Sequence, residues 1–399
     1  MHAIPGPLSG VVVVDLGQIY NGPYCSFLLA RAGATVIKVE PPGGENMRRR
    51  GVVGGAMLPF AMLNSNKNFV TLNLKSERGK TTLIEMAGRA DVLLENFAPG
   101  AMDRLGLGPK TLMKENTRLI YAAGSGYGWS GPYREYPAMD LTVQAMSGVM
   151  SSTGFPEGPP VKAGPALCDF FCGVHLYGAV TTALFQRERT GKGQFVEVSM
   201  LEAVYFSLSS SLGLVFGSKG QGPQRTGNRH GGLAESPYNV YATKDGWIAI
   251  ICVTEAHWQA LIEAMALPDL RDDPRLGTLK DRVAHMDFVD ATVEAWTRKH
   301  DKEPLFALLL SHRIPCAPVR GLSEVMEDPH LHARGALRHI DHPLLGDIVV
   351  PTGAMRYGDA EPPPIEPSKA LGADNDAVYG DWLGRGPDEI AAMRRDGVI

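Results

Sequence analysis

Short apolar strands alternate with helical segments through the first half of the chain, and this alternation restricts the possible folds more than any other feature. Val11 to Leu16 is a β-branched run typical of a buried parallel strand. Pro23 to Ala32 is helical with a proline in its first turn, and Thr35 to Val39 is a second strand. Such a βαβ unit predicts a right-handed crossover and a ligand site at the carboxyl ends of the strands.

The same alternation continues to about residue 216. Further strands are expected at 69–74, 91–95, 118–122 and 194–199, and helices at 79–87, 101–105, 140–147, 170–187 and 200–216. This series predicts an α/β fold with an open, mainly parallel, Rossmann-like sheet. Composition changes at 217–233, which is rich in Gly, Gln and Arg and indicates a linker or mobile loop. Beyond it, the sequence predicts a smaller α+β unit, with strands at 247–253 and 315–319 and helices at 255–265, 286–300 and 302–312. A final helix is expected at 387–395.

Composition excludes several classes of partner. The net charge of -4 gives no support for a nucleic-acid partner. The longest apolar run, Phe170 to Phe185, is shorter than the roughly 20 residues that span a bilayer, so no membrane partner is expected. No secretory signal is visible, and five scattered cysteines indicate reduced thiols, so the expected compartment is the cytoplasm. No metal site is expected, because neither the Cys168/Cys172 pair nor the His330/His332 pair has further ligands nearby in the sequence.

Two glycine patterns bear on a nucleotide site. The G-x-G-x-x-G fingerprint is absent from the first βα turn. Gly126, Gly128 and Gly131 do match it, but Pro132 and a polar stretch follow where the helix should begin. Dinucleotide binding is therefore not expected at either place.

One acid, Asp169, lies between a Gly/Pro-rich loop and the long apolar run. A carboxylate at the start of a buried helix can cap it by accepting hydrogen bonds from the first N–H groups. It can also lie at the positive end of the helix dipole as a nucleophile or base. Spacing alone leaves both roles open.

Several long stretches, in this order, resemble the class III coenzyme A transferases (CaiB/BaiF-like proteins), the family that includes formyl-CoA transferase, carnitine CoA-transferase and α-methylacyl-CoA racemase. They are GATVIKVEPPGG (33–44), NKNFVTLNLK (66–75), ADVLLENFAPGAMDRLGLG (90–108), SSTGFPEGPP (151–160), ALCDF (166–170), RTGKGQFVEVSMLEA (189–203) and DPHLHARG (328–335). The resemblance covers nearly the whole chain.

The resemblance implies that Asp169 is the catalytic nucleophile. In this family the matching Asp attacks the thioester of an acyl-CoA, and a mixed anhydride and then an aspartyl-CoA thioester follow. The enzyme would move CoA from an acyl-CoA donor to a carboxylic acid, here small dicarboxylic or hydroxy acids. CoA would be a substrate rather than a tightly bound cofactor. Covalent intermediates of this kind need a site that excludes water.

The resemblance also implies the CoA contacts, which would be Leu72, Lys75, Asn96, Phe97, Ala101 and Arg104. Lys75 and Arg104 suit phosphates, and Phe97 suits the adenine region. A solvated Lys75 and a core Phe97 remain open alternatives. Gly231 and Gly232 resemble the flexible glycine loop that covers the intermediate.

The chain departs from the family's pattern at two places. The racemase branch has a His immediately before the Asp matching Asp140, whereas this chain has Met139, and a thioether transfers no proton. This favours a transferase over an acyl-CoA racemase or an intramolecular CoA isomerase, which stay the alternatives. Asp140 is expected to be a polar support or the N-cap of the helix through Ser147. Formyl-CoA transferase has a Gln where this chain has Tyr20, with Gln18 two residues earlier, so formyl/oxalate specificity is not expected.

The family's architecture implies the domains and the assembly. Residues 1–216 would form the N-terminal part of the large Rossmann-like domain, 217–233 a linker or glycine loop, 234–325 a small α+β domain, and 326–399 a segment that returns to the large domain. Two protomers would interlock as a homodimer. A non-catalytic nucleotide-binding or scaffolding protein is the remaining alternative, and the intact Asp169 loop argues against it.

Overall fold

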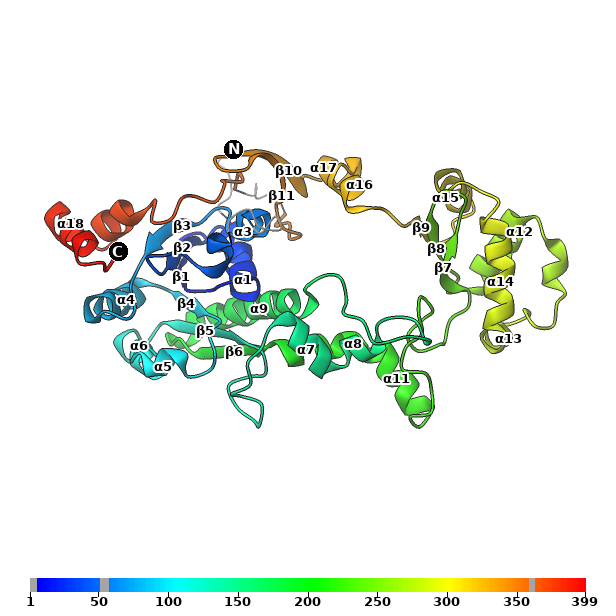
Figure 1. The fold of residues 1–399 in the computed structure, drawn as a ribbon, viewed down its shortest axis with the longest axis horizontal. Coiled ribbons are helices and arrows are strands. Elements are labelled where there is room, and N and C mark those ends of the chain that lie inside the picture. The colour runs from blue at the N-terminus through cyan, green and yellow to red at the C-terminus, as the bar shows by residue number, and fades with distance from the viewer. Residues whose placement is uncertain (1–5, 51–56, 359–362) are drawn as a thin grey trace. The chain divides into compact units, whose positions relative to one another are not determined.

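The computed structural model describes residues 6–50, 57–358 and 363–399 (Figure 1). Its contacts divide the chain into two compact units. The large unit contains Met1–Val143, Pro165–Val204 and Met326–Ile399, and the small unit contains Gln144–Gly164 and Tyr205–Val325.

The large unit is built on a six-stranded sheet in which all neighbouring strands are parallel, in the order β3-β2-β1-β4-β5-β6. The strands are β1 (Val12–Asp15), β2 (Thr35–Glu40), β3 (Asn68–Thr71), β4 (Val92–Glu95), β5 (Ile120–Ser125) and β6 (Phe195–Ser199). The expected Rossmann-like parallel sheet is confirmed. The strand order reverses between β1 and β4, and ligands of such sheets bind beyond the carboxyl ends of the strands at that point.

Helices cover both faces of this sheet (Figure 1). Side chains alternate along each strand, so Val13, Val36 and Ile120 pack toward α1 (Asn21–Arg31) and α9 (Leu167–Thr190). The neighbouring residues on the strands face a second core with α4 (Glu77–Arg89), α6 (Pro109–Glu115) and α18 (Pro387–Arg395). Further elements of this unit are α2 (Asn46–Arg49), α3 (Met57–Leu63), α5 (Ala101–Arg104), α17 (Pro329–Ala333), the hairpin β10 (Leu337–His342) with β11 (Gly346–Pro351), and a π-helix at Ala377–Trp382. Two helices, α7 (Asp140–Ser147) and α10 (Met200–Tyr205), begin in this unit and end in residues of the small unit.

The last residues of the chain close one edge of the sheet. The N–H groups of Phe69 and Thr71 in β3 donate to the side chains of Asp374 (2.7 Å) and Asn375 (2.9 Å). The Tyr379 hydroxyl donates to the Thr71 carbonyl at 2.7 Å. These side chains satisfy backbone groups that an edge strand otherwise leaves open.

A glycine brings α1 and α9 into close contact. A Cβ at Gly173 would lie 2.7 Å from the Asn21 carbonyl oxygen and 2.9 Å from the Tyr24 ring. Only glycine fits this approach without movement of one helix. The first turn of α9, which carries Asp169, is thereby held beside the first turn of α1.

The apolar run at 170–185 belongs to a longer helix than expected. α9 has 24 residues, and the helical run Met200–Gly217 has 18, and both are long and apolar enough to cross a bilayer. The expectation of a run too short for a span applied to Phe170–Phe185, which is only part of α9, and by length and composition alone the whole helix could cross a bilayer. Leu176, Val180 and Ala183 of α9 are nevertheless buried in the core beneath the sheet.

The small unit carries a three-stranded antiparallel sheet in the order β7-β8-β9, with β7 (Tyr238–Ala242), β8 (Trp247–Ile251) and β9 (Cys316–Pro318). Trp258, Leu261 and Val289 lie in its core. Its helices are α8 (Val149–Ser152), α11 (Ser209–Gly217), α12 (Glu255–Met265), α13 (Leu279–Ala284), α14 (Met286–Thr297), α15 (Lys302–Ser311) and α16 (Leu322–Met326). The single helix expected at 200–216 is interrupted by a 3₁₀ turn at Phe206–Leu208.

Candidate active site

A cavity of about 250 Å³ lies where β1, β4 and β5 end. Its wall combines the turns after these strands with the start of α9, and the residues used below are Gln18, Asn21, Asn96, Phe97, Arg134, Met139 and Asp169. This is the position that the strand order predicts for a ligand.

Buried charges fix the turn after β1 from below. The Asp15 carboxylate accepts hydrogen bonds from the Gly17 N–H (2.7 Å), the Ser26 hydroxyl (2.6 Å) and the Lys67 ammonium (3.1 Å). Burial opposes ionisation of Asp15, but the ammonium groups of Lys67 and Lys38 lower its pKa. Burial lowers the pKa of Lys67 to about 8, although Asp15 opposes this. The ion pair therefore holds the turn rigidly against the sheet.

The side-chain amide of Asn96, the residue that follows β4, holds the next part of the same turn. The Gln18 N–H donates to Asn96 Oδ1 at 2.7 Å, and Asn96 Nδ2 donates to the Gln18 carbonyl at 2.8 Å. The next residue, Ile19, has a φ of 64°, which is strained for a β-branched side chain. Its N–H donates to Glu45 Oε2 at 3.2 Å. These contacts supply the constraint that the strained conformation requires.

Asp169 lies in the first turn of α9 but does not cap the helix. The N-cap residue is Ala166, which makes no side-chain cap. Asp140 supplies the cap instead, because its Oδ1 accepts from the N–H groups of Cys168 (2.9 Å) and Asp169 (3.4 Å). The capping interpretation of Asp169 is therefore wrong. Asp140 is the first residue of α7, and these two hydrogen bonds agree with the polar support that was one of its two predicted roles, the other being the N-cap of α7 itself.

The environment of Asp169 favours its protonated form. The residue is 8% exposed. Burial, and secondly the Asp140 carboxylate, raise the pKa of Asp169 to about 7, while the backbone N–H of Asn21 opposes the rise. Near neutral pH the carboxyl is thus partly ionised, and a carboxylate of raised pKa is a more basic and hence stronger nucleophile.

Asn21 lies beside Asp169 and has unused hydrogen-bonding capacity. Its Oδ1 is buried and has no hydrogen-bond partner among the described residues. A Cβ at position 124 would lie 3.1 Å from Asn21 Oδ1. The glycine at this position therefore leaves space next to that oxygen. The side chain is 4% exposed and lines the cavity. Sequence reasoning missed Asn21, although its place after the first βα turn was a signal.

Arginines and tyrosines form the rim. Arg134 lines the cavity together with Tyr127 and Tyr136, and the centroids of the two tyrosine rings lie 6.1 Å apart. A Cβ at Gly100 would lie 3.3 Å from Arg134 Nη2 and 3.4 Å from Arg104 Nη1, so both guanidinium groups lie close to this glycine. Arg134 was also missed, because the stretch after Gly131 was interpreted only as unsuited to a dinucleotide site.

Comparison with known proteins decides the family. The sequence matches CoA-transferase family III over residues 8–375. The chain belongs to this family. It is 39% identical to the acetyl-CoA:oxalate CoA-transferase of Acetobacter aceti over 83% of this chain and 85% of that protein. It is 36% identical to the formyl-CoA:oxalate CoA-transferase of Streptomyces coelicolor over 98% and 99% of the two chains. A CAIB/BAIF family protein from Brucella suis has a similar structure, with a TM-score of 0.83 and 31% identity over 95% of this chain and 100% of that chain.

The family III CoA-transferase brings four of the predicted site residues together in the cavity: Gln18, Asn96, Phe97 and Asp169. Lys75 and Arg104 are exposed and Ala101 is half-buried. Leu72 belongs to the second core, on the face of the sheet covered by α4, α6 and α18, and is 1% exposed.

Three more of the predicted residues, Tyr20, Gly231 and Gly232, also lie outside this cavity. Tyr20 lines a separate apolar pocket of about 560 Å³ and stacks on Phe170, with ring centroids 5.9 Å apart. Gly231 and Gly232 belong to the small unit, where Gly231 contacts Ser211 and the His230 ring lies against Gly232.

One group of side chains in the transferase has the spacing of metal ligands. The ligand atoms of Glu327, His332 and His339 lie within 4.8 Å of one another. The His332 ring contacts the Met326 carbonyl at 2.8 Å, and the His339 ring contacts the Asp347 carboxylate at 3.2 Å. None of these residues lines the cavity that contains Asp169, so the group has no part in the chemistry derived below.

Proposed function

We propose that this enzyme transfers CoA from an acyl-CoA to a carboxylic acid through covalent intermediates on Asp169. The observation that carries the proposal is a buried carboxyl group in a cavity at the carboxyl ends of the strands, with a pKa of about 7 and no capping role. The alternatives of racemase or isomerase have less support, because the described residues that line the cavity include the Met139 thioether and no carboxyl or imidazole besides Asp169.

The proposed reaction begins and ends with a free Asp169 carboxylate. A carboxylate oxygen attacks the thioester carbon, the C–S bond breaks, and CoA leaves as a thiolate from the mixed anhydride. The thiolate then attacks the Asp169 carbonyl carbon and releases the donor acid, which leaves an aspartyl-CoA thioester. The acceptor carboxylate attacks this thioester, and the returning thiolate takes the acceptor acyl group. Asp169 ends as a free carboxylate, and no proton is gained or lost overall.

Asn21 is proposed to orient the acyl group. Its Nδ2 makes no hydrogen bond to the described residues, so it is available to donate to an oxygen that becomes negative during attack. The Tyr20 ring stacks on Phe170 and faces a different pocket, so it does not replace the glutamine that formyl-CoA transferase has at this position. Gln18 is proposed as a second acyl contact, since it lines the same cavity.

CoA is proposed to bind along the rim. Arg104 and Arg134 suit its phosphates, Lys75 is an exposed cation after β3, and Phe97 offers a ring surface. Leu72 contributes only backbone contact, since its side chain is in the core. Asn96 and Ala101 complete the predicted CoA contacts. The loop with Gly231 and Gly232 is proposed to exclude water from the intermediates.

The proposed acids are small dicarboxylic or hydroxy acids. A cavity of about 250 Å³ is below the usual size of a site for a drug-sized ligand, so the acid it holds beside Asp169 is small. The two relatives described above are named for oxalate, a dicarboxylate, which supports the same class.

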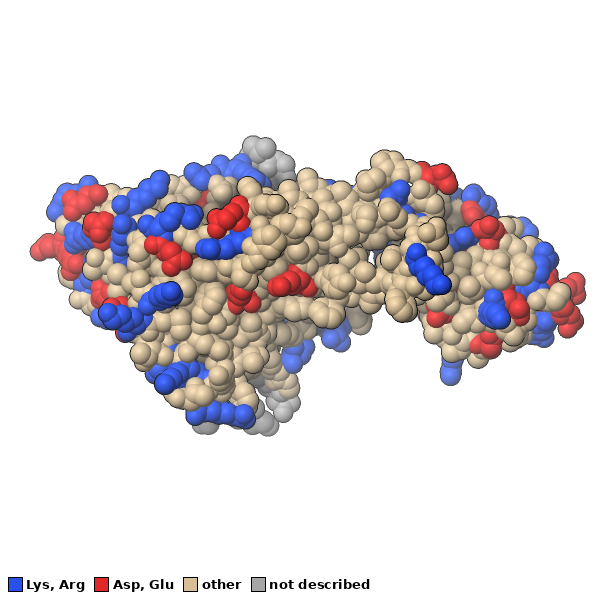
Figure 2. Space-filling model, turned by 90° about the horizontal axis from the view of Figure 1, so that it is seen from below, with Lys and Arg blue, Asp and Glu red and all other residues tan. Residues whose placement is uncertain are grey.

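The enzyme is proposed to work as an interlocked homodimer in the cytoplasm, without a nucleic-acid or membrane partner. Apolar side chains are exposed on each unit: Val174 (42%) and Phe185 (60%) on α9 of the large unit, and Phe206 (82%) and Phe216 (87%) of the small unit. A broad area of the face drawn in Figure 2 carries no charged side chain. Exposed apolar surface of this kind is typical of an interface, and a second copy is the proposed occupant. The mass of the protein in solution, measured by light scattering, tests this.

Chemical trapping tests the covalent step. With an acyl-CoA donor, hydroxylamine should convert Asp169 to a hydroxamate, and borohydride should reduce its thioester, both detectable by peptide mass spectrometry. Asp169→Ala should abolish exchange between acyl-CoA and acid while CoA binding is retained. Asp388→Asn, an acid in the first turn of α18, is the control and should remain active. Exchange by Asp169→Ala at the wild-type rate would refute the proposal.

A further inference from the structure

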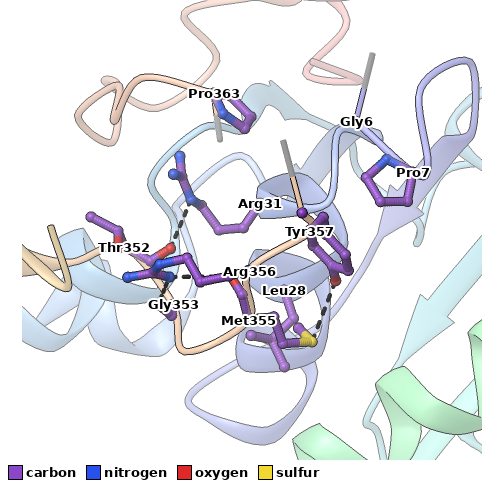
Figure 3. A pocket seen from close by; sticks show the side chains of 11 residues that line it. Gly6, Pro7, Leu28, Arg31, Thr352, Gly353, Met355, Arg356, Tyr357 and Pro363 are labelled. Carbon is purple, nitrogen blue, oxygen red and sulfur yellow. Dashed lines mark hydrogen bonds between the residues drawn. The ribbon is translucent and has the colours of Figure 1, made fainter. Parts of the chain in front are cut away.

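A second cavity of the large unit lies at the opposite end of α1 from Asp169. It has a volume of about 140 Å³ and is lined by the end of α1 and by residues that follow β11, among them Arg31, Thr352, Arg356 and Tyr357 (Figure 3). Arg31 ends the helix that Asn21 begins, and ten residues of α-helix span about 15 Å. This cavity shares no lining residue with the one that contains Asp169.

Arg31 is a buried cation with no acid beside it among the residues that the structure describes. The residue is 6% exposed. Its Nε donates to the Thr352 carbonyl at 2.9 Å, and its Nη1 donates to Asn66 Oδ1 and the Pro364 carbonyl, both at 3.3 Å. All three acceptors are neutral, and within residues 6–50, 57–358 and 363–399 no carboxylate pairs with it. Its Nη2 makes no hydrogen bond to these residues.

A second guanidinium lies close to the first. Arg356 donates through Nη1 to the carbonyls of Gly353 (2.8 Å) and Met355 (3.1 Å) and through Nη2 to the Arg334 carbonyl (3.3 Å). In Figure 3 the two guanidinium groups lie on either side of the Thr352 carbonyl. Burial, and secondly the charge of Arg356, lower the pKa of Arg31 to about 10. Like the first, this cation has no acidic partner in the described parts of the chain.

The end of α1 accounts for part of this charge. Arg31 is the last residue of the helix, where the dipole is equivalent to roughly half a negative charge. That offsets about half of one guanidinium charge, and no described residue compensates the charge of the second guanidinium. An unpaired charge is costly where it is buried, as Arg31 is, so an anion between Arg31 and the exposed Arg356 is favoured.

We propose that this cavity binds a small oxyanion between Arg31 and Arg356. Guanidinium groups match the paired oxygens of phosphate and carboxylate. A volume of about 140 Å³ is too small for a nucleotide or for CoA but suits inorganic phosphate or the anionic group of a small metabolite. The bound anion would link the end of α1 to residues 352–358 and stabilise both.

Thermal unfolding at constant ionic strength, with CoA in excess to occupy the catalytic cavity, tests the proposal. Phosphate should raise the unfolding temperature saturably in the wild type, and Arg356→Gln should weaken this phosphate affinity at least tenfold. Arg356 is exposed and bonds only to backbone carbonyls, so this variant should fold. Arg225→Gln is the matched control, because half-buried Arg225 also bonds to backbone carbonyls, those of Phe155, Ser151 and Gly158. It should respond as the wild type does.

Amide hydrogen exchange locates the effect. Phosphate should slow exchange in peptides covering 28–34 and 352–358 of the wild type and leave them unchanged in Arg356→Gln. Malonate in place of phosphate separates the two sources of the anion: protection by both indicates a general oxyanion site, and protection by phosphate alone indicates a phosphate site. An unfolding temperature that rises equally in wild type and Arg356→Gln, or protection elsewhere only, would overturn the proposal.

Discussion

Replacing Asp140 by Asn removes a negative charge beside Asp169 and leaves an oxygen that can still cap α9. The pKa of Asp169 is about 7, roughly three pH units above its ordinary value of 3.8, which corresponds to about 4 kcal/mol against ionisation. Burial is the larger cause and Asp140 the second, so Asp140→Asn should lower this pKa by about one unit. At pH 6 the ionised fraction of Asp169 then rises from about one tenth to about one half.

The assay is the pH dependence of kcat/KM for CoA exchange. In Asp140→Asn the ascending limb of the plot of kcat/KM against pH should move about one pH unit to lower pH. The value of kcat/KM should rise up to about fivefold at pH 6 and stay unchanged at pH 8.5, where Asp169 is ionised in both proteins. Glu95, whose burial raises its pKa to about 8, does not line the cavity and should titrate equally in both. Asp140→Ala is the comparison variant, since it also removes the cap and should lower the free energy of unfolding by about 1 kcal/mol. An unmoved limb, or one displaced toward alkali, would refute the assignment of Asp140 as a charge that raises the pKa of Asp169.

Three further substitutions test other parts of the site. Asn21→Ala should lower kcat about 100-fold or more while the dissociation constant of CoA, measured by calorimetry, stays within about twofold, because a lost oxyanion donor acts on the transition state. Asp169→Asn should raise the free energy of unfolding by up to about 4 kcal/mol at pH 8 and by much less at pH 5. The reason is that the folded state disfavours ionised Asp169 above its pKa, and this cost disappears as the pH falls toward 3.8. Urea unfolding at both pH values measures the difference. Lys67→Met should lower the free energy of unfolding by about 3–5 kcal/mol, since it leaves Asp15 buried without its partner, whereas Lys80→Met, which removes an exposed pair with Glu77, should change it by less than about 1 kcal/mol.

The sequence predicted the elements whose signals are local. The helices at Glu255–Met265 and Pro387–Arg395 begin and end where the pattern placed them, because a threonine cap and a first-turn proline mark their starts. The strands of the parallel sheet were predicted to within a few residues, since each is a short apolar run between turns.

The contacts that define the site could not be predicted in the same way. Asp140 caps a helix that begins 27 residues later, so its role depends on how α7 packs against α9. Tyr20 and Asn21 are neighbours in sequence, yet one lines an apolar pocket and the other lies beside Asp169. Such orientations follow from packing between distant segments, which a local pattern does not encode. The resemblance identified Asp169 from its motif but gave no sign of Asn21 or Arg134.

The bonds between β3 and residues 374–379 bear on the order in which a ribosome-bound chain acquires structure. Phe69 and Thr71 emerge early in synthesis, but Asp374, Asn375 and Tyr379 emerge about 300 residues later. The three-stranded sheet at 238–318 is encoded without interruption and has all its partners available before then. During most of translation, β3 in the nascent large unit therefore lacks the partners of its backbone groups. Unpaired edge strands are prone to aggregate in such partly folded chains.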